Sequence, residues 1–228
     1  MTILPALQDY RGVIFDLDGT LYKMQWHLRV LITLLVFPQM SLLPRYIKAH
    51  NSFADMDVES GEQLTYLLCK KLSESSNTNL TQAKTWIEKK FYPAFVSAMG
   101  FFRNSRPGLP DLLSRLKSSG KKLAVLSDYG CVAQRLGRLG LDVSLFDEIT
   151  SSETAGALKP CARPFQQIAD SFGMPGSKIV VVGDRNDTDG EAAQRCSMQF
   201  VHVAGSQKHA AGSLAWEEVV NLFAATLA

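Results

Sequence analysis

GVIFDLDGT, residues 12–20, is the stretch that decides the fold, because it joins a buried-strand pattern to two alternate carboxylates. A short apolar, β-branched run that stops at polar and turn-forming residues is typical of such a strand. In a parallel α/β sheet, ligands bind at the carboxyl ends of the strands, where Asp16 and Asp18 would lie. A plain Asp-Gly turn is the alternative, but that turn needs only one carboxylate. The pattern favours a chemical role.

Similar apolar runs recur along the chain, and helical patterns separate them. Further strands are predicted for KLAVLS from Lys122, KIVVVG from Lys178 and QFVHVA from Gln199, with a weaker candidate in EITSSE from Glu148. Leucines at 109, 112, 113 and 116 have the i, i+3, i+4, i+7 spacing of a helix, and residues 132–139, 165–172 and 214–227 repeat it. Strands that alternate with helices of this length predict a parallel sheet covered on both faces.

One long interval between the first and second strands breaks this alternation. Residues 22–103 contain no convincing strand, and helices are predicted over 23–37 and 42–53, from Ser60 with Gln63 in a capping-box position, and from near Thr81. We therefore expect a helical domain of residues 22–103 inserted into an α/β core formed by residues 1–21 and 104–228.

A second acidic cluster follows the apolar run that starts at Lys178. GDRNDTD, residues 183–189, supplies Asp184, Asp187 and Asp189 within a few positions. A solvated loop before the next helix would explain Asp187 or Asp189, but it explains Asp184 beside the strand poorly. Hard cations such as Mg²⁺ take oxygen ligands from one or two carboxylates and leave positions for water and phosphate. Two strand ends with acids therefore indicate a magnesium site.

Acids alone would repel a phosphate group, so a phosphate site also needs donors and a fixed positive charge. Ser127 ends the run LAVLS, where its hydroxyl and the following backbone N–H groups could face an anion. Lys159 precedes Pro160 at the expected start of a helix, whose amino end also favours anions. Taken singly, Ser127 as a helix cap and Lys159 as a surface lysine are the commoner situations.

The order of these four elements makes the pattern specific. The sequence resembles the haloacid dehalogenase (HAD) superfamily, whose four motifs match Asp16-Leu17-Asp18-Gly19-Thr20, Ser127, Lys159, and Asp184 with Asp189. The resemblance covers the core outside the insert and implies a Rossmann-like parallel-sheet core. It also implies that the insert is a helical cap between the first two motifs, as in the phosphoglycolate-phosphatase-like branch.

The resemblance further implies roles for the two aspartates of the first motif. Asp16 would attack phosphorus and form an aspartyl-phosphate, which divides one difficult displacement into two easier ones. Asp18 would protonate the leaving oxygen and then deprotonate the attacking water, a role that requires a raised pKa. Because the dehalogenase branch lacks an acid at the position of Asp18, phosphate-ester chemistry is favoured.

The remaining site residues are assigned by the same likeness. Mg²⁺ would be held by the Asp16 carboxylate, the Asp18 carbonyl and Asp184. The phosphoryl group would be bound by Gly19, Thr20, Ser127 and Lys159. Asp189 would orient Lys159, with Asp187 as the competing choice. Asp128 departs from the asparagine common in the family, so its contact with substrate stays open.

The function implied is a magnesium-dependent phosphatase that acts on small phosphorylated metabolites. A sugar-phosphate mutase uses the same residues, and a catalytically silent binding protein is a third possibility, although every motif position keeps a competent residue. A protein phosphatase is disfavoured because a large cap restricts access. Five cap residues are candidates for contacting the distal group of a substrate, although each is more commonly a surface residue: His27, Arg29, Arg45, Lys48 and His50.

Composition sets the expected partners. A formal charge of +2 in 228 residues gives no field that would draw nucleic acid or a membrane. Four widely spaced cysteines show no CxxC pattern, and MTILPALQDY lacks the basic and then apolar order of a signal peptide, so a cytoplasmic location is expected.

Residues 28–43 are strongly apolar but interrupted by Pro38 and Gln39, and we expect two core helices there. A membrane-surface role of this segment is the alternative.

Overall fold

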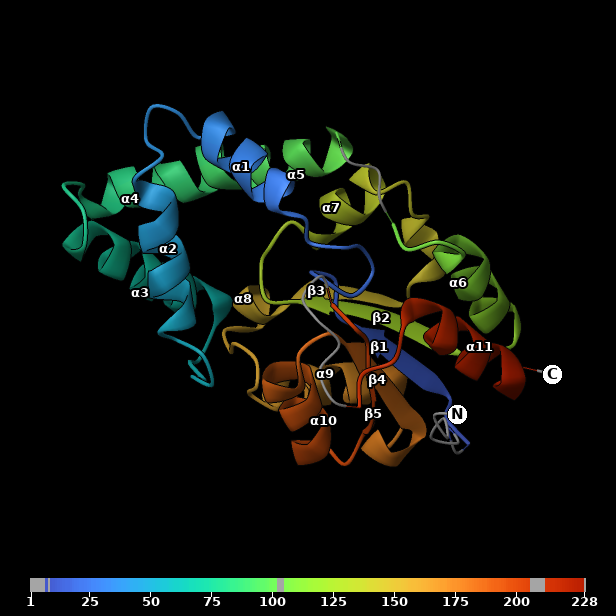
Figure 1. Cartoon of the computed structure of the whole chain (residues 1–228). Coiled ribbons are helices and arrows are strands. Elements are labelled where there is room, and N and C mark those ends of the chain that lie inside the picture. The colour runs from blue at the N-terminus through green and yellow to red at the C-terminus, as the bar shows by residue number, and fades with distance from the viewer. Residues whose placement is uncertain (1–6, 8, 102–104, 206–211, 228) are drawn as a thin grey trace.

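A computed structural model describes residues 7, 9–101, 105–205 and 212–227 of the chain. Within these residues, five strands form one parallel sheet in the order β3-β2-β1-β4-β5 (Figure 1). The strands are β1 (Gly12–Phe15), β2 (Lys122–Ser127), β3 (Glu148–Ser151), β4 (Ile179–Gly183) and β5 (Gln199–His202). The α/β fold and all five predicted strands are therefore confirmed, including the weak candidate at Glu148.

The register of the sheet brings the ends of three strands together. Phe15, at the end of the central strand β1, pairs with Val125 of β2 and Val182 of β4. Because the strands are parallel, the residues that follow these pairs leave the sheet at the same edge. Asp16, Ser127 and Asp184 therefore lie side by side at the carboxyl edge.

Helices cover both faces of the sheet, because consecutive residues of β1 and β4 point to opposite faces and all are buried. Val13 and Phe15 belong to one buried cluster with leucines of α6 (Leu109–Ser118) and residues of α7 (Val132–Arg138) and α11 (Trp216–Thr226). Ile14 belongs to a second cluster with α9 (Arg163–Phe172) and α10 (Glu191–Arg195). Short turns connect these elements: η2 (Val143–Leu145), α8 (Ser152–Ala155), η3 (Gly176–Lys178) and η4 (Asn186–Gly190).

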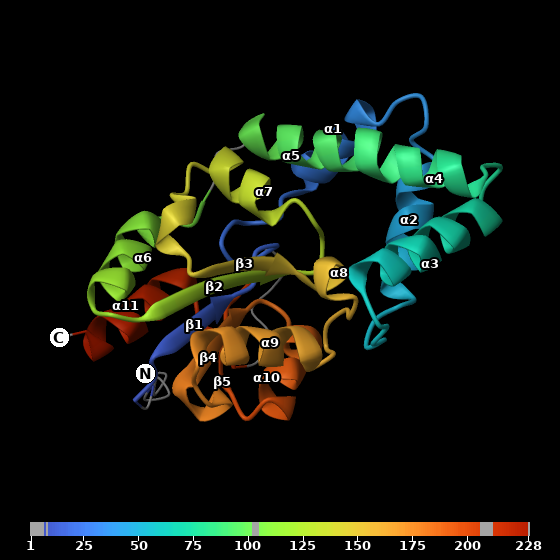
Figure 2. The same ribbon diagram turned by 180° about the vertical axis from the view of Figure 1, so that it is seen from behind.

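The insert after β1 is helical and forms a cap beside the core (Figures 1 and 2). Its elements are α1 (Trp26–Leu35), α2 (Leu42–Asn51), α3 (Gly61–Glu74), α4 (Leu80–Trp86), η1 (Ile87–Phe91) and α5 (Tyr92–Phe101). Asn79 and Gln82 form a full capping box, so the helix expected near Thr81 begins at Leu80. The domain division at residues 22 and 103 stays a prediction, and the boundary at 103/104 lies outside the described residues.

The prediction of two core helices over residues 28–43 is only half right. Leu28, Ile32 and Val36 are buried, but Val30 and Leu34 on the opposite side of α1 are exposed. The reason is that α1 packs on α5 with one side, and no described element covers its other side. Among the described residues, no helix is both long enough and apolar enough to cross a membrane.

Candidate active site

Lys159 and two aspartates from different strand ends meet in the interior of the protein. Lys159 Nζ donates hydrogen bonds to Asp16 Oδ1 at 2.8 Å and to Asp189 Oδ1 at 2.7 Å, and all three side chains are buried. Burial disfavours the charged amine, but the charges of Asp16 and Asp189 outweigh it and raise the pKa of Lys159 well above its usual value. The lysine therefore stays protonated.

The structure places Asp189, and not Asp187, beside Lys159. Asp187 forms an exposed ion pair with Arg185 instead, with Arg185 Nη2 at 2.7 Å from Asp187 Oδ2. The difference follows from η4, which begins one residue after Arg185 and turns Asp189 inward while Asp187 stays at the surface. Asp128, whose contact the sequence left open, accepts a hydrogen bond from Lys159 N at 3.3 Å.

Three carboxylates at this edge could hold a cation. One oxygen each of Asp16, Asp184 and Asp189 lies within 4.8 Å of the others. Asp16 Oδ2 is buried and has no hydrogen-bond partner among the described residues. Burial, together with repulsion from Asp189 and Asp18 that Lys159 only partly offsets, raises the pKa of Asp184 to about 6. An unpartnered buried oxygen in a set of hard oxygen ligands fits a divalent cation such as Mg²⁺.

Gly19 makes the close approach of the first motif to Asp184 possible. Its φ of +104° lies in the region that favours glycine, and a Cβ at this position would lie 2.1 Å from Asp184 Oδ2. Thr20 is fully buried, and its hydroxyl has no partner among the described residues. The loop is fixed by Arg106, whose buried guanidinium donates to the carbonyls of Gly19, Thr20 and Ala204 at 2.7, 3.0 and 3.0 Å.

A buried arginine that the sequence analysis missed binds the second aspartate. Arg135 Nη1 donates to both carboxylate oxygens of Asp18 at 2.8 Å, and Arg135 Nη2 donates to Ser127 Oγ and to the Tyr129 carbonyl. Ser127 Oγ donates to Asp18 Oδ2 at 2.7 Å, and the Tyr22 hydroxyl donates to Asp18 Oδ1. Asp18 and Ser127 therefore bind each other and Arg135 in this arrangement.

The expectation of a raised pKa for Asp18 is wrong for this arrangement. Burial would raise the pKa, but the charge of Arg135 and hydrogen bonds from Tyr22, Arg135 and Ser127 lower it below its usual value. A signal for Arg135 was present in the sequence. It stands three residues after Val132 and one before Leu136, on the apolar stripe of the predicted helix, where a charged residue needs a buried partner.

Another buried ion pair joins the cap to the core. Glu153, at the start of α8, accepts hydrogen bonds from the hydroxyls of Tyr46 and Tyr92 in the cap and from the backbone N–H of Gly130. His50 Nε2 of α2 lies 3.3 Å from Glu153 Oε1. Burial would lower the pKa of His50, but the adjacent carboxylate of Glu153 raises it overall. Of the cap candidates, His50 is buried at the core, whereas Arg29, Arg45 and Lys48 are exposed.

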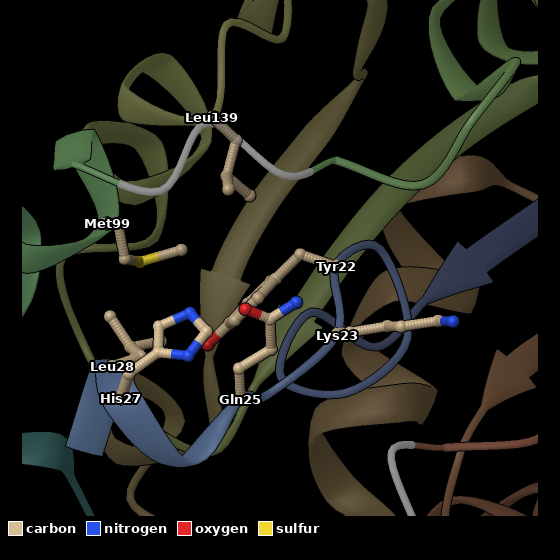
Figure 3. A pocket seen from close by; sticks show the side chains of 7 residues that line it. All are labelled: Tyr22, Lys23, Gln25, His27, Leu28, Met99 and Leu139. Atoms are coloured by element: carbon tan, nitrogen blue, oxygen red, sulfur yellow. The ribbon is translucent and has the colours of Figure 1, made fainter. Parts of the chain in front are cut away.

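Two cavities in the described residues lie away from the aspartates. One, of about 10 Å³, lies at the base of the cap, where Tyr22 and Leu28 face Met99 and Leu139 (Figure 3). It is too small for more than one water molecule. The other is an open groove of about 970 Å³ beside α3 and α4 that reaches Glu153. Neither is lined by Asp16 or Lys159, which are buried, whereas Asp184 and Asp18 beside them are partly exposed.

Comparison with known proteins identifies relatives of this arrangement. Residues 10–196 match the model of a family described as haloacid dehalogenase-like hydrolase. The chain is 24% identical over 203 residues to glyceraldehyde 3-phosphate phosphatase of Methanocaldococcus jannaschii, covering 85% of this chain and 84% of that protein. It is 26% identical over 194 residues to phosphoglycolate phosphatase of Neisseria meningitidis, covering 84% and 80%.

A solved structure shares the fold over nearly the whole chain. The putative HAD-hydrolase YfnB of Bacillus subtilis, solved bound to magnesium, superposes on this chain with a TM-score of 0.65. The sequences are 16% identical, and the superposition covers 95% of this chain and 100% of that one. At this level of identity the likeness extends to the fold alone.

Proposed function

Because this chain belongs to the haloacid dehalogenase-like hydrolase family, we propose that it is a Mg²⁺-dependent phosphatase of small phosphorylated metabolites that forms an aspartyl-phosphate on Asp16. One observation carries the proposal. Asp16 is a buried carboxylate with one oxygen on Lys159 and the other without a hydrogen-bond partner among the described residues. A nucleophilic carboxylate needs an oxygen that is free to bind a reaction partner. The named phosphatase relatives support the substrate class.

The cation would be held by the carboxylates of Asp16 and Asp184 and by the Asp18 carbonyl. When bound, Mg²⁺ supplies positive charge that offsets the repulsion between Asp16 and an anionic substrate. Burial and the neighbouring acids raise the pKa of Asp16 well above its usual value, although Lys159 opposes them. A divalent charge at this position would keep Asp16 ionised at neutral pH.

The other side chains divide between phosphoryl binding and proton transfer. Lys159 and the backbone N–H groups of Gly19 and Thr20 would stabilise the charge on the transferring phosphoryl oxygens, with Asp189 orienting the lysine. Asp18 would serve as general acid and base, which requires it to exchange its contact with Arg135 for one with the leaving oxygen. Ser127 would turn to the phosphoryl group in the same exchange.

Access to this site involves the cap. Asp16 and Lys159 are almost fully buried, so a substrate reaches them only after the cap, or the loops around the site, move. A closed site suits small substrates and keeps water from the leaving group. We place this activity in the cytoplasm, where the four free cysteines of the structure would remain thiols.

The test is phosphate release from a panel of phosphorylated metabolites, with Mg²⁺ and then with a chelator. We expect metal-dependent release that Asp16→Asn abolishes. Asp187→Asn is the matched control, since Asp187 belongs to the acidic loop but pairs with exposed Arg185. Turnover retained in Asp16→Asn would refute the nucleophile. Interconversion of sugar-phosphate isomers without net phosphate release would identify a mutase instead.

A further inference from the structure

The outer side of α1 is apolar and unpartnered. Trp26, Val30, Leu34 and Phe37 follow one another at helical spacing, on the side opposite buried Leu28 and Ile32, and the exposed fractions of Trp26, Leu34 and Phe37 are 75%, 59% and 67%. Figures 1 and 2 place α1 on the outside of the cap, in front of α5 in one view and behind it in the other. We call these four residues the outer face of α1, although Phe37 lies in the turn two residues after the helix ends at Leu35.

This outer face is unusual for a surface helix. A helix at the surface of a globular protein normally carries one apolar stripe toward the core and polar residues on the other side. Phe101, at the end of α5, the helix on which α1 packs, is also exposed, at 72%. Contiguous exposed apolar residues of this kind mark an interaction surface.

The segments that contain α1, α2 and α5 carry basic residues and no acids. Residues 19–54, which include α1 and α2, contain four Lys or Arg and no Asp or Glu. Residues 89–101, which include α5, contain exposed Lys89 and Lys90 and no acid. The side chains of Arg29, Arg45 and Lys48 are exposed. The chain as a whole is nearly balanced, with 24 basic and 22 acidic residues, so these two segments are more basic than the chain on average.

We propose that the outer face of α1 binds the surface of an anionic lipid bilayer. Tryptophan and phenylalanine rings enter the interface between headgroups and acyl chains, and lysine and arginine stems reach from there to lipid phosphates. A second copy of this chain fits less well, because an isologous contact would bring two acid-free cationic surfaces together. No membrane partner was expected from the sequence, because the net charge is only +2 and residues 28–43 were expected to be buried. The proposal does not depend on the phosphatase activity.

Trp26 makes the proposal directly testable. Of the three tryptophans, Trp86 and Trp216 are buried, so a change of emission on adding vesicles reports Trp26. We expect vesicles of phosphatidylcholine with phosphatidylglycerol to shift the emission of the full chain to the blue and to sediment the protein. Raising the salt concentration should weaken binding several-fold, because cations attract the anionic lipid.

Leu34→Ser/Phe37→Ser should lose most of this binding, at least ten-fold, while phosphate release from a water-soluble substrate is unchanged. Tyr66→Ser, which removes an exposed ring from α3, is the matched control and should bind like the unchanged chain. No binding of the unchanged protein to anionic vesicles, or equal binding of the double variant, would overturn the proposal. Light scattering that gives a dimer mass, reduced to the monomer by Leu34→Ser/Phe37→Ser, would assign the face to a second copy instead.

Discussion

Arg135 holds both carboxylate oxygens of Asp18 at 2.8 Å, although the two residues lie 117 positions apart. The arginine side chain is fully buried, and its charge is the largest of the effects that oppose burial and lower the pKa of Asp18. The pair joins helix α7 to the loop after β1, and through Ser127 it joins the end of β2. The pair therefore links these elements, and Arg135 is the partner of Asp18, the proposed acid and base, in this arrangement.

Replacement of Arg135 by Met should destabilise the protein by about 3 kcal/mol, because it leaves a buried carboxylate without its counter-charge. Asp18→Asn in the same chain should restore part of that loss, since the neutral amide needs no counter-charge. Urea denaturation of the four members of this double-mutant cycle measures the coupling. Arg138→Met, an exposed position on the same helix, is the control and should change stability by less than about 0.5 kcal/mol. Additive effects of Arg135→Met and Asp18→Asn would contradict a direct coupling.

Gly19→Ala should abolish Mg²⁺-dependent turnover while the chain still folds. The new Cβ would lie 2.1 Å from Asp184 Oδ2, and the φ of +104° is strained for any side chain, so the first motif and Asp184 must separate. The Mg²⁺ concentration for half-maximal activity should rise more than ten-fold in any residual turnover. Gly108→Ala is the control, because Gly108 also has a positive φ of 70° but open space around it. An unchanged Mg²⁺ requirement in Gly19→Ala would remove Asp184 from the proposed metal site.

The predictable parts of this fold are those encoded over a few consecutive residues. Each of the five strands, from the one at Gly12 to the one at Gln199, is visible in the sequence as a short apolar segment. The meeting of the aspartates and Ser127 could then be predicted, because parallel strands end at one edge of the sheet. Lys159 could be assigned to the site only through the order of the motifs. Its contact with Asp189 depends on the η4 turn, which the sequence did not predict. Sequence spacing could not separate Asp187 from Asp189, since both lie in one short loop.

The contacts that sequence could not supply join distant segments through buried charge. Arg106 binds carbonyls of the first motif, and Glu153 meets His50 across the junction of cap and core. No pattern in the local sequence predicts such pairs, because the position of one partner in the chain does not determine the position of the other. The outer face of α1 was missed for a related reason. An apolar helix predicts burial, and only the tertiary structure shows that one side has no neighbour.

The His50–Glu153 pair should make stability depend on pH in a defined direction. Glu153 raises the pKa of His50 above its usual value despite burial, so the stabilisation is complete below pH of about 6.5 and is lost as pH rises through the folded pKa. Burial raises the pKa of Glu153, but His50 and the tyrosines lower it overall, so its contribution is lost only in acid. Urea denaturation should show that His50→Gln is most destabilising near pH 6 and less so near pH 9. This pH dependence should vanish in a Glu153→Gln background, and its persistence there would assign it to another group.

Lys159→Met should lower kcat by about a hundred-fold or more, because it removes a fixed positive charge from the transferring phosphoryl group and leaves Asp16 and Asp189 facing each other. Lys159→Arg should recover little activity, since a planar guanidinium does not fit a buried cavity shaped around one ammonium bonded to two carboxylates. Lys178→Met is the control, because Lys178 pairs with Asp9 at the surface and lies just before β4, at the edge of the sheet opposite the site. Steady-state kinetics with saturating Mg²⁺ separates this effect from metal loss. If Lys159→Met kept its kcat and only raised KM, the lysine would bind the phosphoryl group equally in ground and transition states, and stabilisation of the transferring charge would have to come from the backbone N–H groups of Gly19 and Thr20.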